Sequence, residues 1–149
     1  MKHENEAVLR FPSLSSNEAF ARSVTAAFAA QMDPTLDELG DVKTAVSEAV
    51  TNAIVHAYPD RIGPVLLRLR RLEGNILEIT VKDNGVGIPD IAQARQPMFT
   101  TGGVERAGMG LTIVESFMNS LSLRSQPGRG TTVRMRKKLI GRGETTCKP

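Results

Sequence analysis

Apolar residues recur along this chain at two spacings, and each spacing predicts a different kind of element. Short alternating or continuous apolar runs, bounded by glycine, proline and asparagine, are typical of β-strands. Such runs lie at residues 7–11, 65–72, 76–81, 121–125 and 131–139. The second and third runs are joined by Glu73-Gly74-Asn75 and the last two by residues 127–130, so each pair is expected to form a hairpin.

Apolar residues at helical spacing predict three longer elements. The first helix is expected to begin at Ser15 or Ser16, to end near Met32 and to bury one apolar face. The residues expected on that face are Phe20, Val24, Ala27 and Phe28. A third helix is predicted over residues 109–121, between the strand predicted at residues 76–81 and the one predicted at residues 121–125.

The second helix has the clearest signals. Thr35 and Glu38 have the T-x-x-E form of a capping box, in which each side chain bonds a backbone N–H group at the start of the helix. An apolar stripe then continues to about His56. Its members are Leu39, Val42, Val46, Ala49, Val50, Ala53, Ile54 and Ala57.

The order of these elements predicts an α+β fold. Strands that come in hairpins form a mostly antiparallel, mixed sheet, and the long helices must then cover one face of it. We therefore expect a two-layer α/β sandwich, formed by a single domain over residues 1–140. Residues 141–149 are expected to form a basic, disordered tail.

Composition narrows the possible functions. Hydrophobic residues make up 40% and charged residues 23% of the chain, and no apolar run approaches the ~20 residues of a membrane span. One cysteine and two histidines argue against a disulfide framework and against a Cys- or His-rich metal site. The first residues also lack the apolar stretch of a signal peptide. We therefore expect a soluble cytoplasmic protein that does not bind membranes.

The formal net charge of +3 is unevenly distributed. Residues 134–149 contain six basic side chains and one acidic, whereas the rest of the chain contains 13 basic and 15 acidic. Aromatic residues are only 4% of the chain, so this basic end lacks the aromatic side chains typical of many nucleic-acid sites. We interpret it as a solvated end and expect no direct binding of nucleic acid.

Four short motifs could carry chemistry. Glu48 and Asn52 lie one turn apart on the second helix, where a carboxylate and an amide can orient a hydrated Mg²⁺ ion or a water molecule. Asp83 follows a strand and begins a glycine-rich loop over residues 83–89 that could approach a ligand closely. Taken alone, the first motif is better explained as an ordinary polar helix face, whereas an ordinary turn explains the second as well as a ligand site does.

The other two motifs are glycine-containing segments. Gly108 and Gly110 lie at the entry to the third helix, whose free N–H groups could bind phosphate. Residues 128–132 form a G-R-G-T-T turn into the last strand. The chain has neither a Walker A motif nor the protein-kinase H-R-D and D-F-G motifs, so any nucleotide site belongs to another class.

Taken in order, the four motifs resemble the Bergerat-type ATP-binding fold of gyrase B, Hsp90, histidine kinases and MutL. The resemblance covers the chain from Leu36 to Arg136. Residues 17–22, 47–54 and 87–101 are more specifically similar to the sporulation anti-sigma-F factors, which are small serine kinases built from this domain alone.

The resemblance implies ATP or ADP and Mg²⁺ as ligands. Asn52 would hold the Mg²⁺ ion, and Glu48 would act as general base. Asp83 would bind the adenine N6 amine, with Thr131 assisting through water. Two glycines would shape the adenine pocket, namely Gly85 and Gly87.

The same resemblance implies a lid over the triphosphate at residues 98–108. This segment has Gly102 where the family usually has lysine, which makes Arg106 the best remaining cation. The residues expected to contact the phosphates are Thr100, Thr101, Arg106, Gly108 and Gly110.

Members of this family inhibit a sigma-F-type RNA polymerase sigma factor as homodimers and phosphorylate a serine of an anti-anti-sigma factor. Glu18 and Arg22, one turn apart on the first helix, would bind these partners; without the resemblance they are only an intrahelical ion pair. Two alternatives remain open. One is a module that sequesters the sigma factor without turnover, and the other is an ATPase clamp, for which the necessary transducer domain is missing.

Overall fold

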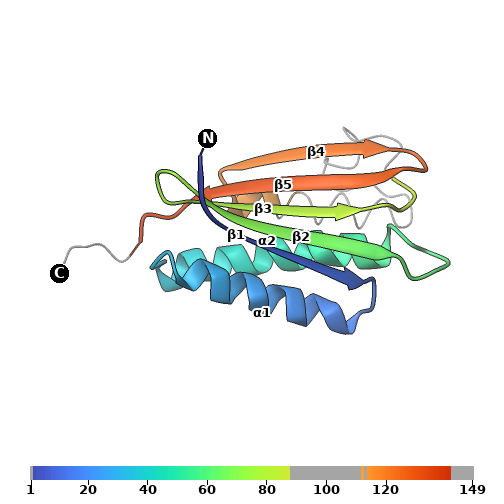
Figure 1. The fold of residues 1–149 in the computed structure, drawn as a ribbon, viewed down its shortest axis with the longest axis horizontal. Helices are drawn as coiled ribbons and strands as arrows, with labels where there is room; N and C mark the ends of the chain where they lie inside the picture. The colour runs from blue at the N-terminus through green and yellow to red at the C-terminus, as the bar shows by residue number, and fades with distance from the viewer. Residues whose placement is uncertain (1, 88–111, 113, 142–149) are drawn as a thin grey trace.

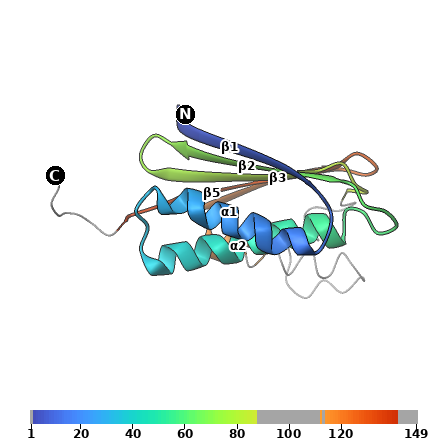
Figure 2. The same ribbon diagram turned by 60° about the horizontal axis from the view of Figure 1, so that its bottom comes forward.

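The computed structural model describes residues 2–87, 112 and 114–141. Five strands form one sheet, and two long helices lie side by side on one of its faces (Figures 1 and 2). The elements are β1 (His3–Pro12), α1 (Ser16–Ala30), α2 (Leu36–Val55), β2 (Pro64–Leu72), β3 (Ile76–Asp83), β4 (Ser120–Gln126) and β5 (Gly130–Lys138). This arrangement confirms the expected α+β, two-layer sandwich.

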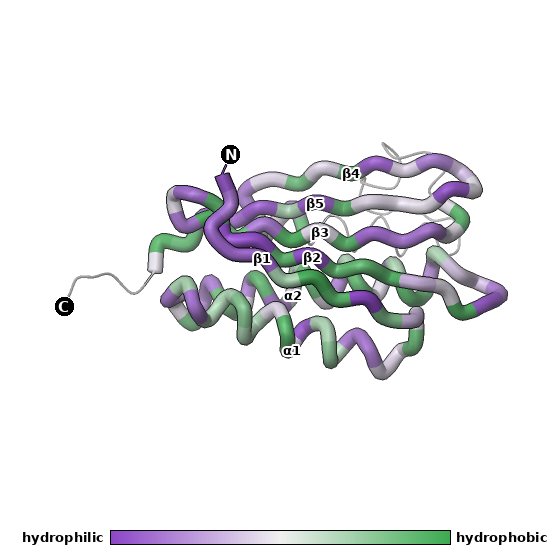
Figure 3. Tube along the Cα trace, in the orientation of Figure 1, coloured by the Kyte–Doolittle hydropathy of each residue, from purple (hydrophilic) through white to green (hydrophobic). Residues whose placement is uncertain are grey.

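The strands lie in the order β1-β2-β3-β5-β4, and all four of these pairings are antiparallel. Side chains alternate between the two faces of each strand. Figure 3 colours the chain by hydropathy and shows hydrophilic and hydrophobic residues mixed along the strands. Along β2, for example, Val65, Leu67 and Leu69 belong to the core beneath the helices. Leu66 and Arg68, between them, therefore lie on the opposite face.

The apolar stripe predicted for α2 is confirmed. The buried residues of this helix are Val42, Ala45, Val46, Ala49, Val50, Ala53 and Ile54. The capping box is confirmed as well: the Glu38 backbone N–H donates to Thr35 Oγ1 at 3.0 Å, and the Thr35 N–H donates to Glu38 Oε1 at 2.9 Å. The start and the buried side of α2 were thus both readable from the sequence.

The buried face of α1 agrees with the prediction only in part: Phe28 is buried and Val24 packs against the core, but Phe20 and Ala27 are exposed. Its buried residues are Ala21, Thr25, Phe28 and Ala29, whereas Phe20 is 49% exposed. Small side chains occupy the inner face because they let α1 approach its neighbours closely, and the larger Phe20 ring points outward. Ser15 is the N-cap residue, as expected, but its side chain makes no capping hydrogen bond.

The third helix ends earlier than predicted. Residues 112 and 114–117 are helical, and β4 begins at Ser120, so Leu121 lies in the strand. The cause is Asn119, whose N–H donates to the Arg136 carbonyl at 2.9 Å and whose Oδ1 accepts from the Lys138 N–H at 2.7 Å. These bonds to β5 end the helix before Leu121.

No helix within residues 2–87, 112 and 114–141 has the length and apolar character needed to cross a bilayer.

Glu38 also connects the start of α2 to the segment that follows β5. Its carboxylate accepts from the backbone N–H groups of Ile140, at 2.6 Å, and Gly141, at 3.1 Å. Burial alone would raise the pKa of Glu38, but the N–H groups of Thr35, Ile140 and Gly141 hold it below its usual value of 4.5. The folded state therefore favours the charged form.

Replacing Glu38 with alanine should lower the free energy of unfolding by about 1–2 kcal/mol at neutral pH, because the cap and both C-terminal hydrogen bonds are lost. Since the pKa of Glu38 is lowered by folding, its contribution is present above pH 4.5 and is lost as the pH falls through the folded-state pKa. Urea unfolding of both proteins should show a difference that shrinks between neutral pH and about pH 3. A difference that stays constant would mean that the charge of Glu38 contributes nothing.

Candidate functional site

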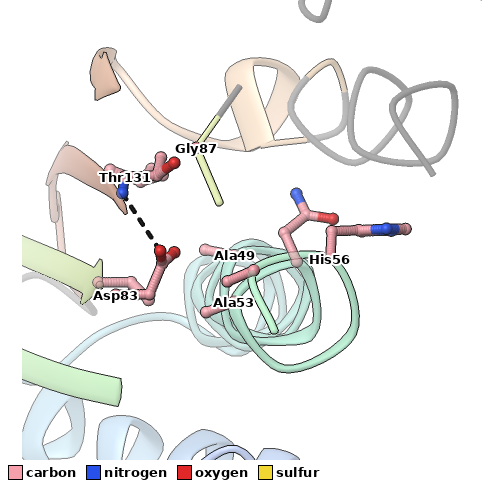
Figure 4. Close-up of a pocket in the computed structure, with 10 residues that line it drawn as sticks. Ala49, Ala53, His56, Asp83, Gly87 and Thr131 are labelled. Atoms are coloured by element: carbon pink, nitrogen blue, oxygen red, sulfur yellow. Dashed lines mark hydrogen bonds between the residues drawn. The ribbon is translucent and has the colours of Figure 1, made fainter. Parts of the chain in front are cut away.

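A pocket lies between the second half of α2 and the ends of β3 and β5 that face it. Figure 4 shows Asp83 and Thr131 across the pocket from Ala49 and Ala53 of α2. The described residues that line it are Ala49, Asn52, Ala53, His56, Ala57, Val81, Asp83, Gly87, Thr131 and Val133. Four residues that the sequence analysis proposed for nucleotide binding, Asn52, Asp83, Gly87 and Thr131, are therefore brought together.

Asp83 is the buried acid of this pocket. Its side chain is 7% exposed, and its Oδ1 atom accepts from the Gly85 N–H at 2.9 Å and from the Thr131 N–H at 3.2 Å. Burial raises the pKa of Asp83 above its usual 3.8, although the two N–H donors oppose the shift. Both of these bonds end on Oδ1, which leaves Oδ2 to accept from a ligand.

The loop after β3 contacts other backbone segments so closely that its glycines cannot be replaced without displacement. A Cβ atom on Gly85 would lie 2.1 Å from the carbonyl oxygen of Ala57. Gly87, at φ 78°, has a backbone conformation that side chains disfavour, and its Cβ would lie 2.3 Å from the Gln126 carbonyl oxygen. Gly85 does not line the pocket, but its contact with Ala57 sets the path of the loop that does.

Tyr58, just after the end of α2, holds this loop in place, and it is a residue that the sequence analysis did not single out. Its hydroxyl donates to the Pro64 carbonyl at 2.6 Å and accepts from the Asn84 N–H at 2.7 Å. One residue earlier, the Ala57 carbonyl accepts from the Val86 N–H at 2.9 Å. A buried tyrosine hydroxyl requires such partners, but their identity depends on tertiary structure and no sequence pattern indicated them.

Ser125 is a second residue that the sequence analysis missed. Its hydroxyl and that of Thr131 share a hydrogen bond of 2.8 Å, and the Ser125 hydroxyl also donates to the Gly130 carbonyl. The Thr131 side chain is therefore fixed by β4, the neighbouring strand. A Cβ on Gly130 would lie 2.1 Å from the Asp83 carbonyl oxygen, which explains the glycine before Thr131.

Glu48 does not line this pocket. It lies in a second hollow, a groove along α1 and α2, together with Arg22, Gly40, Lys43, Thr44 and Ser47. We call this hollow the helix groove. Asn52 is one turn further along α2, so the same helix presents Glu48 to the groove and Asn52 to the pocket.

Glu18 and Arg22 form the ion pair expected from their spacing. Arg22 Nε donates to Glu18 Oε2 at 3.0 Å, and the Ser47 hydroxyl donates to the same oxygen at 2.6 Å. The Ser47 contact joins α1 to α2 and was not anticipated from the sequence. It holds Arg22 beside the groove that contains Glu48.

The remaining predicted contacts lie outside the described residues. They are Thr100, Thr101, Arg106, Gly108, Gly110 and the rest of the lid segment. The tail from residue 142 onward is likewise outside them.

Comparisons with known proteins agree with this fold. The family profile of the histidine kinase-like ATPase domain matches residues 11–137. Among solved structures, the RsbU and RsbW domains of a Mycobacterium tuberculosis protein share the fold, with a TM-score of 0.69 at 16% identity over 95% of this chain and 35% of that one. The blue-light activated histidine kinase of Erythrobacter litoralis has a TM-score of 0.58 at 25% identity over 78% of this chain and 40% of that one.

Two curated relatives are much more similar in sequence. The anti-sigma F factor of Caldanaerobacter subterraneus is 54% identical over 95% of this chain and 99% of its own length. The anti-sigma F factor of Bacillus subtilis is 51% identical over 91% of this chain and 94% of its own. With the pocket, the matched profile and these relatives together, the chain belongs to the anti-sigma F factors, within the histidine kinase-like ATPase family.

Proposed function

We propose that this protein is an anti-sigma factor that binds a sigma-F-type sigma factor and uses ATP to phosphorylate a serine of an anti-anti-sigma factor. The observation that carries the proposal is the position of α2. This helix presents Asn52 to the pocket and Glu48 to the helix groove, where Arg22 lies. One rigid element thereby connects a nucleotide site to a surface suited to a protein partner.

The pocket suits adenine better than guanine. Asp83 Oδ2 is available to accept a hydrogen bond, which the exocyclic N6 amine of adenine can donate and the O6 carbonyl of guanine cannot. The Thr131 hydroxyl, held by Ser125, can reach the base through a water molecule. ATP and ADP are therefore the nucleotides we assign to the pocket.

Asn52 is the residue we assign to Mg²⁺. Its side-chain amide lies on the pocket wall and makes no hydrogen bond to another described residue. Within the described part of the chain no three His, Cys, Asp or Glu side chains cluster as metal ligands. One amide oxygen fits an ion that keeps several waters and takes its other ligands from phosphates. The ion would neutralise phosphate charge.

Glu48 is the residue we assign as general base. Its carboxylate makes no ion pair with another described residue, so it can accept a proton from a serine hydroxyl delivered through the helix groove. As Glu48 takes that proton, the serine oxygen bonds to the γ-phosphorus of ATP and the bond to the β–γ bridging oxygen breaks. ADP leaves, and the partner keeps the phosphoserine.

Glu18 and Arg22 are the residues we assign to partner binding. Glu18, whose carboxylate also accepts from Ser47, orients the Arg22 guanidinium in the groove, which lowers the entropy lost when Arg22 binds an acidic partner. We also propose a homodimeric state, a role in sporulation and transcription regulation, and a lid at residues 98–108, all three on the basis of the resemblance. The proposed cytoplasmic location rests on the composition of the chain. Sequestration of the sigma factor without turnover is the alternative, and the position of Glu48 favours the kinase.

Tyr58→Phe should weaken ATP binding by about tenfold, equivalent to ~1.4 kcal/mol, because the Asn84 N–H and Pro64 carbonyl lose their partner and the loop after Asp83 loosens. Calorimetry with ATP measures the effect. Glu38→Ala is the matched control, since it should lower stability at the far end of α2 without changing ATP affinity. Equal losses of affinity in both variants would show that Tyr58 acts only through global stability.

Glu48→Gln should keep ATP affinity and slow phosphorylation of the partner by ~10²-fold or more, the usual effect of losing a positioned base. Labelled ATP, Mg²⁺ and the anti-anti-sigma protein encoded in the same genome provide the assay, with phosphoserine as the readout.

Arg22→Ala is the comparison for this assay. It should also keep ATP affinity, but it should raise the concentration of partner needed for half-maximal rate rather than abolish the rate at saturation.

Phosphorylation at the normal rate by Glu48→Gln would refute the base assignment. Tight ATP binding by the wild type without any phosphoserine product would favour the sequestering module.

A further inference from the structure

The face of the sheet opposite the helices carries an unusual concentration of positive charge. Residues that are paired across neighbouring strands form rows over the sheet. Three neighbouring rows cross this face, and they contain Arg70, Arg68 and Leu66 of β2, respectively. The basic side chains in these rows are Arg10, Arg68, Arg70, Lys82, Arg124, Arg134 and Arg136. We call this surface the basic sheet face.

Only two acidic side chains, Glu6 and Glu78, lie in the same three rows, which gives a net charge of +5. The helices on the other side have the opposite sign: α1 and α2 contain two basic and five acidic residues, a net charge of −3. The two layers in Figure 2 thus differ in charge as well as in structure. Because charges of opposite sign on the two layers partly cancel, the net charge of the whole chain is only +3.

The two glutamates neutralise only part of the surface. Glu78, 3% exposed, lies between Arg70 and Arg136 and pairs with Arg136 at 2.8 Å. Glu6 pairs with Arg70 at 2.9 Å. Five basic residues of the face form no ion pair with another described residue, namely Arg10, Arg68, Lys82, Arg124 and Arg134.

The centre of the face contains hydrogen-bonding groups without partners. Thr80 lies between Arg68 and Arg134 in the register and is 5% exposed. Neither its hydroxyl nor the Nε atom of Arg68 has a hydrogen-bond partner within residues 2–87, 112 and 114–141. Buried polar groups without hydrogen-bond partners are unfavourable. A carboxylate that docked over this row would accept hydrogen bonds from the arginines and neutralise their unpaired positive charge.

We propose that the basic sheet face is a docking surface for an acidic, carboxylate-rich segment of a partner protein. Charge complementarity selects this occupant. A second copy of the same face would bring two surfaces of +5 together, which is repulsive. Single-stranded nucleic acid is bound with aromatic side chains that stack on bases, and the rows contain none. The proposal does not depend on kinase activity, because the face lies on the side of the sheet away from the helix groove.

The test compares three defined probes on the full chain: decaglutamate, decaglutamine and decathymidylate. Arg10→Gln/Arg134→Gln lowers the net charge by two on the face without removing an ion pair to a described residue. Ala30→Glu/Leu36→Glu lowers it equally on the helical side and is the matched control. Circular dichroism and ATP affinity confirm that both variants remain folded.

We expect decaglutamate to bind and decaglutamine not to bind, with an affinity that falls as salt rises above about 0.1 M. The face variant should weaken decaglutamate binding at least about fivefold, whereas the control should retain it.

Three results would overturn the proposal. The first is no binding of decaglutamate, or an equal loss in both variants, which would indicate a response to net charge alone. The second is tighter binding of decathymidylate than of decaglutamate. The third is sedimentation showing that the wild type self-associates through this face and that the face variant does not.

Discussion

The geometry of the candidate site depends on the buried carboxylate of Asp83. An ionised carboxylate that is 7% exposed is strongly unfavourable unless donors surround it. The donors here are the backbone N–H group of Gly85, two residues after Asp83 in the loop, and that of Thr131, which is far away in the sequence but lies opposite Asp83 where β3 pairs with β5. Satisfying Asp83 therefore fixes both the loop and the strand that form the pocket wall.

The other side of the pocket depends on how α2 ends. Ala57 and Tyr58, just after the helix, bond to the backbone of the loop at Val86 and Asn84. The loop is consequently attached to α2 as well as to the sheet. Because α2 is also capped at Thr35 and Glu38, it is a rigid element over which Glu48 and Asn52 keep a fixed separation. Rigid placement of reacting groups is what phosphoryl transfer chiefly requires of a protein.

Much of this arrangement could be read from the sequence, for identifiable reasons. The stripe of α2 consists of valine, isoleucine and alanine at regular spacing beside an explicit cap, and the strand hairpins are marked by glycine turns. In the sequence Asp83 directly follows a predicted strand, and in the structure it is the last residue of β3. Each of these features could be predicted because it depends on residues that are close together in the sequence.

Other features depended on tertiary contacts. The inner face of α1 is set by close packing of alanine and threonine, which have too little hydrophobic contrast to reveal it. Leu121 fits either a helix or a strand, and the bonds of Asn119 to β5 decide between them. The hydroxyls of Tyr58, Ser47 and Ser125 find partners that are near only in the folded chain. The basic sheet face likewise arises because separate strands align their arginines in the same rows.

The central claim, that Asp83 recognises adenine, is tested most directly by measuring ATP and GTP affinities of the wild type and Asp83→Asn by calorimetry. Asparagine retains an oxygen that can accept from Gly85 and Thr131, so the fold should persist while the second acceptor is lost. We predict a preference of the wild type for ATP, and a loss of ATP affinity in Asp83→Asn on the order of 1–3 kcal/mol. Unchanged ATP affinity together with an unchanged preference over GTP would remove Asp83 from the nucleotide site.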